Sequence, residues 1–411
     1  TRSMTQAITF SQFQLPSHAP SSAQWTLKLL TKLKKGRLEI VTPEGVHLLF
    51  GGEEDQPSAK IKLNSWAVCQ RALKAGDIGF AEAYIAGEWE THDIASVLGV
   101  FLENRKAVET VIYGSFLGSI AYKIKHLLNR NTKAQAKKNI HAHYDLGNPF
   151  YQLWLDPTMT YSSALFDGDT SLSLEQAQHA KYQAMLNYLT PKSGEQVLEI
   201  GCGWGGFAEK ACAAGANLVG LTLSTEQLAY AKARLAKQGF ADQADFRLQD
   251  YRDCRGQFDH IASIEMFEAV GEEYWPAYFQ SVNRLLKKGG KAAIQTIVIQ
   301  DELFDRYRKG TDFIQQYIFP GGMLPSPAKF RAMAEKHGLR VVSEKAFGKD
   351  YAETLRRWRE QFMKTLKQVK NQGFDDPFIR TWEFYLAYCE AGFEYESTDV
   401  IQFYLEKVEN Q

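Results

Sequence analysis

The stretch that decides the fold is Val197-Leu198-Glu199-Ile200-Gly201-Cys202-Gly203-Trp204-Gly205-Gly206. Its first four residues are mostly apolar and predict a buried parallel strand, and a helix is expected to begin at Phe207. The glycines between strand and helix let backbone amides approach a ligand at the start of that helix. Glycine serves such turns for purely structural reasons about half the time. The pattern nevertheless indicates a nucleotide-binding turn.

The order of residues in this turn favours one cofactor. Acid-x-Gly-x-Gly fits S-adenosylmethionine better than NAD or a P-loop nucleotide. Glu199 is expected beneath the turn, facing the cationic end of the cofactor, and Gly201, Gly203 and Gly205 are expected to give backbone access. A sulfonium needs no metal to be an electrophile, and the nine histidines form no convincing metal cluster with acids or cysteines. We therefore expect S-adenosylmethionine and no metal.

Length and composition bound the class of protein. With 411 residues, 45% of them hydrophobic and 23% charged, the chain is expected to form a globular protein of two or more domains. No apolar run approaches the roughly 18 to 20 residues of a membrane span and no start resembles a signal peptide, which predicts a cytoplasmic location. A formal net charge of zero does not suggest nucleic-acid binding. A homodimer is compatible with the sequence.

Residues 1–112 predict a small α+β domain. Strands are expected at 38–42 and 46–50, as a hairpin around Pro43-Glu44-Gly45, and a third strand at 60–63. A basic segment precedes the hairpin, in which leucines alternate with cations: Lys28, Lys32, Lys34, Lys35 and Arg37. Such an amphipathic segment can lie on anionic lipid, and a solvated helix face is the alternative.

Residues 113–140 predict a helical linker with a basic end. No acid lies between Glu109 and Asp145, whereas six cations do: Lys123, Lys125, Arg130, Lys133, Lys137 and Lys138. Each cation near an anionic membrane contributes about 1 kcal/mol. We expect the linker to hold the protein peripherally on the inner face of the membrane.

Residues 141–411 predict a doubly wound α/β sheet with its ligand at the carboxyl ends of parallel strands. Strands are expected at 197–200, 217–223, 245–248, 258–264 and 292–299, and helices at 175–189, 224–238 and 272–286. Two aromatic-rich helical insertions, 301–327 and 351–395, are interpreted as the walls and lid of a hydrophobic substrate tunnel. Core packing is the alternative explanation of their aromatic residues.

Several motifs together make the chain resemble the cyclopropane-fatty-acyl-phospholipid synthases, from roughly residue 30 to the C-terminus. They are the glycine turn, His143-Tyr144-Asp145-Leu146-Gly147-Asn148, Gln249-Asp250-Tyr251-Arg252-Asp253, Met266-Phe267-Glu268, Tyr317-Ile318-Phe319-Pro320-Gly321-Gly322 and Phe347-Gly348-Lys349-Asp350-Tyr351. The resemblance implies a Rossmann-like class I methyltransferase fold. It also implies methyl transfer from S-adenosylmethionine to a cis double bond in a phospholipid acyl chain, followed by ring closure.

The resemblance assigns the remaining cofactor contacts. Many methyltransferases place an acid at the end of the second strand, but this sequence has Thr222 there, and the resemblance gives the ribose to Thr222 and Gln227. Asp250 looks like the adenine contact, with its neighbour Gln249 in the same motif and with Tyr251 and Trp204 packing nearby. For Asp250, a helix N-cap is the alternative role.

Attack on an alkene leaves a carbocation, which aromatic faces stabilise by about 0.5 to 2 kcal/mol each when water is excluded. Tyr161, Tyr317 and Phe319 are the candidates for these faces. A base must then remove a proton. The resemblance implies a bound bicarbonate as that base, with Glu268, the backbone of Ile297 and Tyr351 among its ligands.

This sequence departs from the family at the other bicarbonate ligands. Ser163 stands at the cysteine position and Gln295 at the histidine position, and Ala269 follows Glu268 where the family has histidine. Glu265 stands where the family has glycine. We hypothesise that Glu265 replaces the bicarbonate, because two carboxylates in a dry pocket repel and the pKa of one rises. A structurally paired surface acid is the alternative for Glu265.

Three functions remain open at this level. The first is C-methylation of unsaturated phospholipid acyl chains, which gives a cyclopropane if the proton leaves the new methyl, or a methyl-branched alkene or methylene product if it leaves the chain. The second is N-methylation of a soluble amine, as in plant alkaloid N-methyltransferases that look like this family. The third is a lipid-binding protein that has lost catalysis. The basic segments disfavour the second, and the intact glycine turn disfavours the third.

Overall fold

The computed structural model describes residues 6–52, 57–114, 123, 125 and 146–408. The predicted linker helix at 113–140 and the start of the motif at His143 therefore lie almost entirely outside the described residues. The chain forms two compact units. Unit 1 consists of Thr1–His126, Arg306–Ile318 and Lys370–Ser397, and unit 2 consists of Leu127–Asp305, Phe319–Val369 and Thr398–Gln411.

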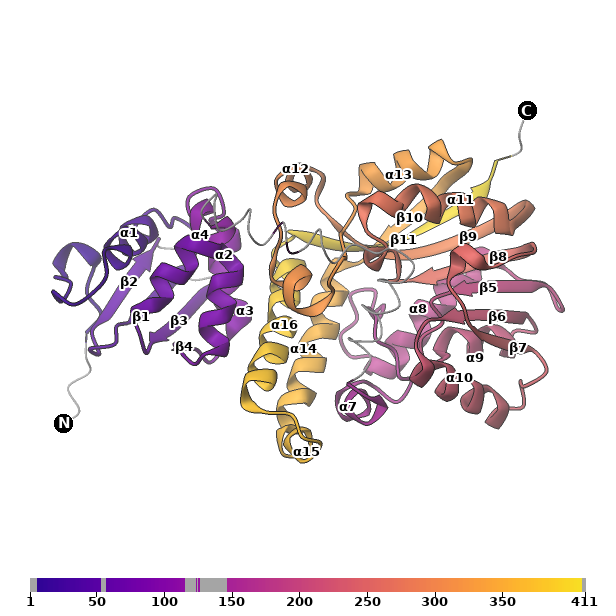
Figure 1. Cartoon of the computed structure of the whole chain (residues 1–411), viewed down its shortest axis with the longest axis horizontal. Coiled ribbons are helices and arrows are strands. Elements are labelled where there is room, and N and C mark those ends of the chain that lie inside the picture. The colour runs from indigo at the N-terminus through magenta and orange to yellow at the C-terminus, as the bar shows by residue number, and fades with distance from the viewer. Residues whose placement is uncertain (1–5, 53–56, 115–122, 124, 126–145, 409–411) are drawn as a thin grey trace. The chain divides into compact units, whose positions relative to one another are not determined.

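Unit 1 contains a four-stranded sheet in the order β2-β1-β3-β4 (Figure 1). β1 (Arg37–Val41) and β2 (His47–Gly51) form an antiparallel hairpin. Its turn closes because Gly45 takes a φ of +87° and the Thr42 N–H donates to the Val46 carbonyl at 2.8 Å. β3 (Ser58–Leu63) runs parallel to β1 and β4 (Trp89–Glu90) pairs with β3. The predicted hairpin, third strand and α+β character are confirmed.

The helical elements of unit 1 come from three parts of the chain. The N-terminal part contributes η1 (Phe10–Gln12), α1 (Ser21–Leu30), α2 (Ala67–Ile85), α3 (Ile94–Glu103) and α4 (Glu109–Tyr113). The later segments contribute η5 (Ile314–Ile318) and α16 (Asp376–Glu394), and α16 packs on α2 and α3. The predicted boundaries at 112 and 140 had placed both later segments in the methyltransferase domain. Their aromatic side chains instead complete the core of unit 1, where Phe313 and Tyr84 both contact Phe384.

Unit 2 contains a seven-stranded sheet in the order β10-β11-β9-β8-β5-β6-β7 (Figure 1). The strands are β5 (Gln196–Ile200), β6 (Asn217–Thr222), β7 (Ala244–Leu248), β8 (Phe258–Ile264), β9 (Leu286–Ile299), β10 (Leu339–Ala346) and β11 (Thr398–Lys407). The five predicted strands are present and pair in parallel. The sheet is nevertheless mixed, because β11 runs antiparallel to both β9 and β10. The last two strands were not predicted.

Helices lie on both faces of this sheet (Figure 1). They are α7 (Asn148–Trp154), α8 (Leu174–Leu189), α9 (Gly206–Ala213), α10 (Thr225–Lys237), α11 (Trp275–Leu285), α13 (Pro327–Lys336) and α14 (Gly348–Lys364), with the short η2 (Tyr251–Asp253), η3 (Phe267–Ala269) and η4 (Glu272–Tyr274). Two more helices, α12 (Asp301–Lys309) and α15 (Leu366–Asn371), have residues in both units. Ser224 caps α10 by accepting from the Gln227 N–H at 3.2 Å, as predicted.

The strand order changes direction at β5. From β5 the chain proceeds to β6 and β7 on one side, and then returns to β8 and β9 on the other. In open α/β sheets, ligands bind outside the carboxyl ends of the strands at such a switch point. The turn after β5 therefore lies where a cofactor pocket is expected. Among the described residues, no helix is both long and apolar enough to cross a bilayer.

Candidate active site

Unit 2 holds a pocket at the carboxyl ends of β5, β6, β7 and β8, with about 1420 Å³ of empty space including its open mouth. Of the residues predicted to bind the cofactor, all except Gly205 line it: Glu199, Gly201, Gly203, Trp204, Thr222, Gln227, Gln249, Asp250 and Tyr251. Glu265, Tyr161 and Phe319 line the same pocket. The cofactor residues therefore share one cavity with the proposed base.

The glycines of the turn do different work. A Cβ placed on Gly203 would meet no other protein atom within 4 Å, so it would occupy pocket space. A Cβ on Gly205 would approach Leu235 to 3.1 Å and Ala231 to 3.3 Å. Gly205 thus lets α9 pack closely on α10 and does not line the pocket, and its predicted role in giving access to the cofactor stays a prediction.

Two buried acceptors at the pocket wall lack a hydrogen-bond partner in the described part of the chain. They are Glu199 Oε1 and Gln249 Oε1. Burial raises the pKa of Glu199 well above its usual value, and the Lys181 ammonium opposes that rise. Thr222 donates its hydroxyl to Gln227 Oε1 at 3.0 Å and so fixes both side chains. These acceptors fit the amino and hydroxyl donors of S-adenosylmethionine.

Asp250 is hydrogen-bonded to Arg252, a residue for which no function was predicted. Its carboxylate accepts from Arg252 Nε at 2.9 Å and Nη2 at 2.7 Å, and from the Arg252 backbone N–H at 2.9 Å. Asp250 therefore caps η2 and also lines the pocket. Arg252 lines the pocket as well, close to the rings of Tyr251 and Tyr274.

Three donors hold the carboxylate of Glu265. Its Oε2 accepts from the Ser163 backbone N–H at 2.8 Å and from Gln295 Nε2 at 2.7 Å, and its Oε1 accepts from the Tyr351 hydroxyl. Burial raises the pKa of Glu265, while Lys181 and the three donors lower it. Glu265 is half-buried within this network and is not a solvated acid, whereas a structurally paired acid remains the alternative to a catalytic one.

The backbone at Glu265 keeps a glycine-like conformation. Its φ is +52°, in the left-handed region that side chains other than glycine rarely adopt. Such a conformation costs roughly 1 to 2 kcal/mol, so it persists only where surrounding contacts fix it. The three hydrogen bonds to the carboxylate are those contacts. Strain of this kind is typical of functional positions.

Glu268 is the second carboxylate of the pair. It accepts from the Thr296 hydroxyl and from the backbone amide of Ile297, and burial raises its pKa to about 8, with the Glu265 charge adding to the rise. The backbone N–H of Glu268 donates to the same carboxylate, so each of the two acids has three donors, and the Lys181 ammonium acts on Glu265 in addition. The two carboxyl groups are therefore set apart by charge: the Lys181 ammonium lowers the pKa of Glu265, whereas the charge of Glu265 raises the pKa of Glu268.

The positions that the resemblance assigns to bicarbonate are thus brought together, but around protein carboxylates. Ser163 (through its backbone N–H), Gln295 and Tyr351 bond Glu265, while the Ile297 amide bonds Glu268. Because these donors are already engaged, the described site does not fit an additional bicarbonate. The Ser163 hydroxyl donates to the Ala164 carbonyl at 2.9 Å instead of contacting Glu265.

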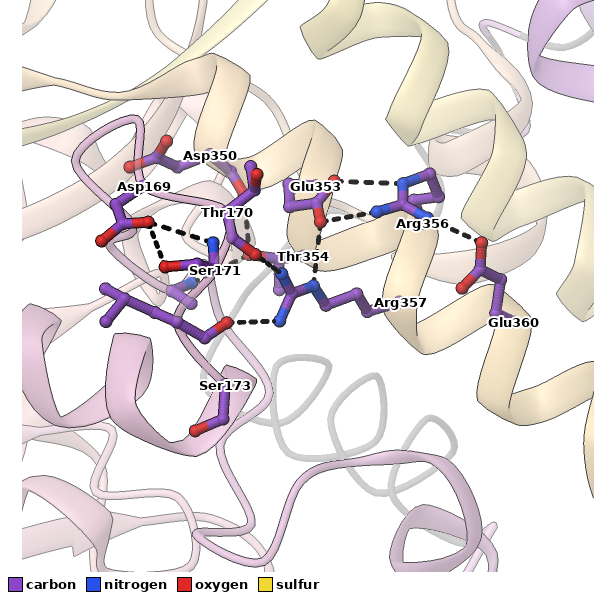
Figure 2. A network of polar contacts seen from close by, with 12 residues as sticks. Asp169, Thr170, Ser171, Ser173, Asp350, Glu353, Thr354, Arg356, Arg357 and Glu360 are labelled. Carbon is purple, nitrogen blue, oxygen red and sulfur yellow. Dashed lines mark hydrogen bonds and ion pairs between the residues drawn. The ribbon is translucent and has the colours of Figure 1, made fainter.

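A polar network fixes α14, which carries Tyr351, to the loop that carries Ser163. Figure 2 shows Arg357 of α14 donating to the carbonyl oxygens of this loop, at 2.7 Å to Thr170 and 2.8 Å to Leu172. Asp350 accepts the backbone N–H groups of Phe166 and Asp167, both at 2.9 Å. The donors to Glu265 therefore keep a set separation although they lie far apart in sequence.

The proposed aromatic faces are only partly assembled in unit 2. Tyr161 lines the pocket and packs against Trp154 and Trp358, with ring centroids 5.6 Å from each. Phe319 also lines it. Tyr317 belongs to unit 1, where it stacks on Phe313 at 5.4 Å, and its place relative to the pocket is not defined.

Lys181 was missed by the sequence analysis. It is fully buried on α8 and donates to Ser162 Oγ at 2.6 Å and to the Ser163 carbonyl at 3.0 Å. The available signal was spacing, because Lys181 falls on the i, i+4 stripe of Ala177, Met185 and Leu189, where only buried residues are expected.

Comparisons with known proteins agree with this geometry. The sequence model of the mycolic acid cyclopropane synthetase family matches residues 131–403. The chain is 40% identical over 348 residues to tuberculostearic acid methyltransferase of Mycobacterium tuberculosis, covering 82% of this chain and 81% of that protein. It is 34% identical over 342 residues to cyclopropane-fatty-acyl-phospholipid synthase of Escherichia coli, covering 82% and 84%. A mycolic acid cyclopropane synthase structure complexed with SAH and CTAB matches with TM-score 0.62 at 32% identity, covering 66% and 98%.

The fold, the glycine turn and these matches define a class I methyltransferase that uses S-adenosylmethionine. More particularly, the chain belongs to the mycolic acid cyclopropane synthetase family. Its relatives include cyclopropane synthases and fatty acid methyltransferases.

Gly203→Val should abolish S-adenosylmethionine binding, because the new side chain would fill pocket space at the turn. Isothermal titration calorimetry measures this. Gly239→Val is the matched control: Gly239 has a φ of +84° and equally open surroundings, but it lies outside the pocket lining. Similar loss of affinity in both variants, or a change of less than about threefold in Gly203→Val, would contradict this position for the cofactor.

Proposed function

We propose that this protein transfers the methyl group of S-adenosylmethionine to the cis double bond of an unsaturated phospholipid acyl chain, and that Glu265 is the base that then removes a proton. The observation that carries the proposal is the Glu265 carboxyl group, fixed by three donors in the wall of the cofactor pocket. A base of this kind is needed when the acceptor is carbon, because the product must lose a proton.

The chemistry divides between the cofactor and the chain. S-adenosylmethionine supplies an electrophilic methyl group, and the electron pair of the broken S–C bond stays on sulfur. The π pair of the alkene forms the new C–C bond, which leaves the neighbouring carbon positively charged. Tyr161 and Phe319 line the pocket, and an aromatic face stabilises such a cation by about 0.5 to 2 kcal/mol. A closed apolar wall also keeps water from trapping the cation.

Glu265 completes the reaction by accepting the proton. If the proton leaves the new methyl group, its C–H electron pair closes the cyclopropane ring. If it leaves the chain, the C–H electron pair forms a double bond and the product is a methyl-branched alkene. A methylene compound forms when a hydride first moves from the methyl-bearing carbon to the adjacent cation and the proton then leaves the new methyl group. The carboxylate is neutral afterwards and the product carries no charge, so the charge of the sulfonium leaves as a proton.

The names of the relatives favour a lipid substrate over the two alternatives. The relatives more than 30% identical include proteins named for tuberculostearic acid, mycolic acid and fatty-acyl phospholipids. Amine methylation needs no base within a dry carboxylate pair, because the amine supplies its own electron pair. An inactive lipid-binding protein would have no need to keep Glu199 and Gln249 as unpaired acceptors at a cofactor turn.

Cells that lack enzymes of this family and express this protein should gain acyl chains one CH2 heavier at the expense of unsaturated chains. Mass spectrometry of their phospholipids measures the gain. Hydrogenation then separates the products, since a methyl-branched alkene takes up hydrogen under conditions in which a cyclopropane does not. Unchanged lipids together with a methylated amine would move the proposal to the second function.

Glu265→Gln should lower the rate of methyl transfer by roughly 10² or more, the usual contribution of a positioned base. Wild-type activity should not respond to removal of dissolved bicarbonate, because the donors that would bind it hold Glu265. Both are measured with purified protein and dispersed phospholipid. A wild type that stalls without bicarbonate would return the role of base to the ion.

Glu265→Gly provides a matched rescue. Glycine suits the φ of +52° and leaves a space between the three donors, so added formate or bicarbonate should restore part of the activity. Glu265→Gln fills that space and should show no rescue. If added formate or bicarbonate changed the activity of both variants equally, the low activity of these variants would not be due to the missing carboxylate.

We place the protein peripherally on an anionic membrane surface, and unit 1 offers a contact face. The first 38 residues of the chain contain no acid. On α1, Leu27 and Leu30 are buried in the core, so they are unable to enter lipid as the amphipathic interpretation required. Trp25 on the opposite face is 68% exposed, and Lys28, Lys32, Lys34, Lys35 and Arg37 around it are exposed too. Tryptophan beside cations suits a bilayer interface.

Trp25→Ala should weaken binding to vesicles of mixed anionic and zwitterionic phospholipid by at least about tenfold, because the indole loses its burial in the interface. Replacing Lys28 and Lys32 by Gln should weaken it further at low salt, at about 1 kcal/mol for each cation. Lys232 and Lys237 on α10 are exposed matched controls. Equal effects of both lysine pairs, or stronger loss when Lys133, Lys137 and Lys138 of the linker are replaced, would move the membrane face away from α1.

A further inference from the structure

Lys181 carries a charge into the dry interior of unit 2. Its side chain is fully buried, and burial lowers the pKa of its ammonium to about 8. Taking an ammonium out of water costs several kcal/mol, which the surroundings must offset. Its two hydrogen bonds go to Ser162 Oγ and to the Ser163 carbonyl, and the second of these residues donates its own backbone N–H to Glu265.

Three carboxylates raise the pKa of Lys181: Glu265 first, then Asp156 and Glu199. Asp156 is tied down locally by the Thr158 backbone N–H at 3.0 Å, and Glu199 forms the floor of the cofactor turn. The titratable groups that interact with Glu265 are the Lys181 ammonium, the Tyr351 hydroxyl and the Glu268 carboxyl group. Lys181 supplies the positive charge among them.

We infer that Lys181 is a positioning residue for the reaction, which keeps Glu265 ionised and fixes the Ser162 and Ser163 backbone that holds it. The inference rests on the proposed role of Glu265 as the base. Without the ammonium, a carboxyl group buried beside Glu268 would hold its own proton near neutral pH and be unable to accept another. With it, the carboxylate is the stable form before each turnover.

The same charge also resets the site. When Glu265 takes the substrate proton it becomes neutral, and Lys181 then faces one carboxylate fewer. The electrostatic attraction between Lys181 and Glu265 is restored only when the proton leaves, so the ammonium favours its release. Lys181 thereby makes Glu265 a weaker base but one that is available again for the next cycle.

The test is the pH dependence of kcat at saturating S-adenosylmethionine. Lys181→Met removes the charge at similar volume. The pKa of Glu265 should rise, so the acid limb should move to higher pH. Activity should fall about tenfold or more near pH 6 and approach the wild-type value near pH 9, where Glu265 is ionised in both proteins. Lys181→Gln, which keeps a donor for the same loop, should show the same shift and serves where the Met variant does not fold.

Gln178→Met is the matched control. Gln178 lies one turn earlier on α8, is fully buried, and donates to the Ser162 carbonyl at 2.8 Å. It holds the same loop without a charge, so its loss should lower kcat by one factor at every pH. Lys181 variants that behave like Gln178→Met would overturn the inference and leave Lys181 as a structural residue.

Failure of the proposed function gives a different result. If Glu265→Gln turns over normally, Glu265 is not the base, whatever the Lys181 variants do. If Glu265→Gln is inactive and the Lys181→Met and Lys181→Gln profiles keep the wild-type acid limb, the base stands and the inference about Lys181 is wrong. S-adenosylmethionine affinity measured at each pH separates any effect through Glu199 from the effect on the base.

Discussion

The active site depends on how buried negative charge is compensated. Glu199 is buried and Glu265 and Glu268 are half-buried, and carboxyl groups with little access to water must either be protonated or be held by donors and cations. Burial raises the pKa of all three, hydrogen-bond donors lower the pKa of Glu265 and Glu268, and the Lys181 ammonium lowers that of Glu199 and Glu265. Each solution constrains the fold around it, because the donors come from β9, α14 and the loop before α8.

That constraint explains why parts of the chain distant in sequence are tied together so firmly. Tyr351 reaches Glu265 only while α14 keeps its place, and Arg357 and Asp350 fix α14 to the loop that follows Ser163. Gln402 of β11 in turn donates to Gln295 Oε1 at 3.0 Å, which orients the Gln295 amide toward Glu265. The antiparallel strand β11 therefore supports the chemistry as well as the sheet.

The cofactor half of the site could be located from local sequence patterns, whereas the base half could be located only through the family resemblance. The glycine turn, Thr222 and Asp250 follow strand ends that local periodicity and turn residues define, so short stretches are enough to place them. The partners of Glu265 come from residues 163, 295 and 351, and no local pattern links these. The segments that contain η5 and α16 were assigned to a tunnel wall, because the spacing of aromatic residues does not show which of two hydrophobic cores a segment packs into. β11 was missed because the alternation of apolar and polar residues at 398–407, directly after a long helix, was not assigned to any element.

In the proposed mechanism a side chain takes the place of a bound ion, which changes the energetics of the reaction. A covalently attached carboxylate is always present, so no binding equilibrium limits the base. The cost is a left-handed backbone at residue 265, roughly 1 to 2 kcal/mol, and the desolvation of a charge. Charge-assisted hydrogen bonds contribute about 1.5 to 3 kcal/mol each, so three of them outweigh the backbone strain and offset part of the desolvation. The remaining compensation has to come from a nearby cation, and Lys181 is the buried ammonium that the fold places there.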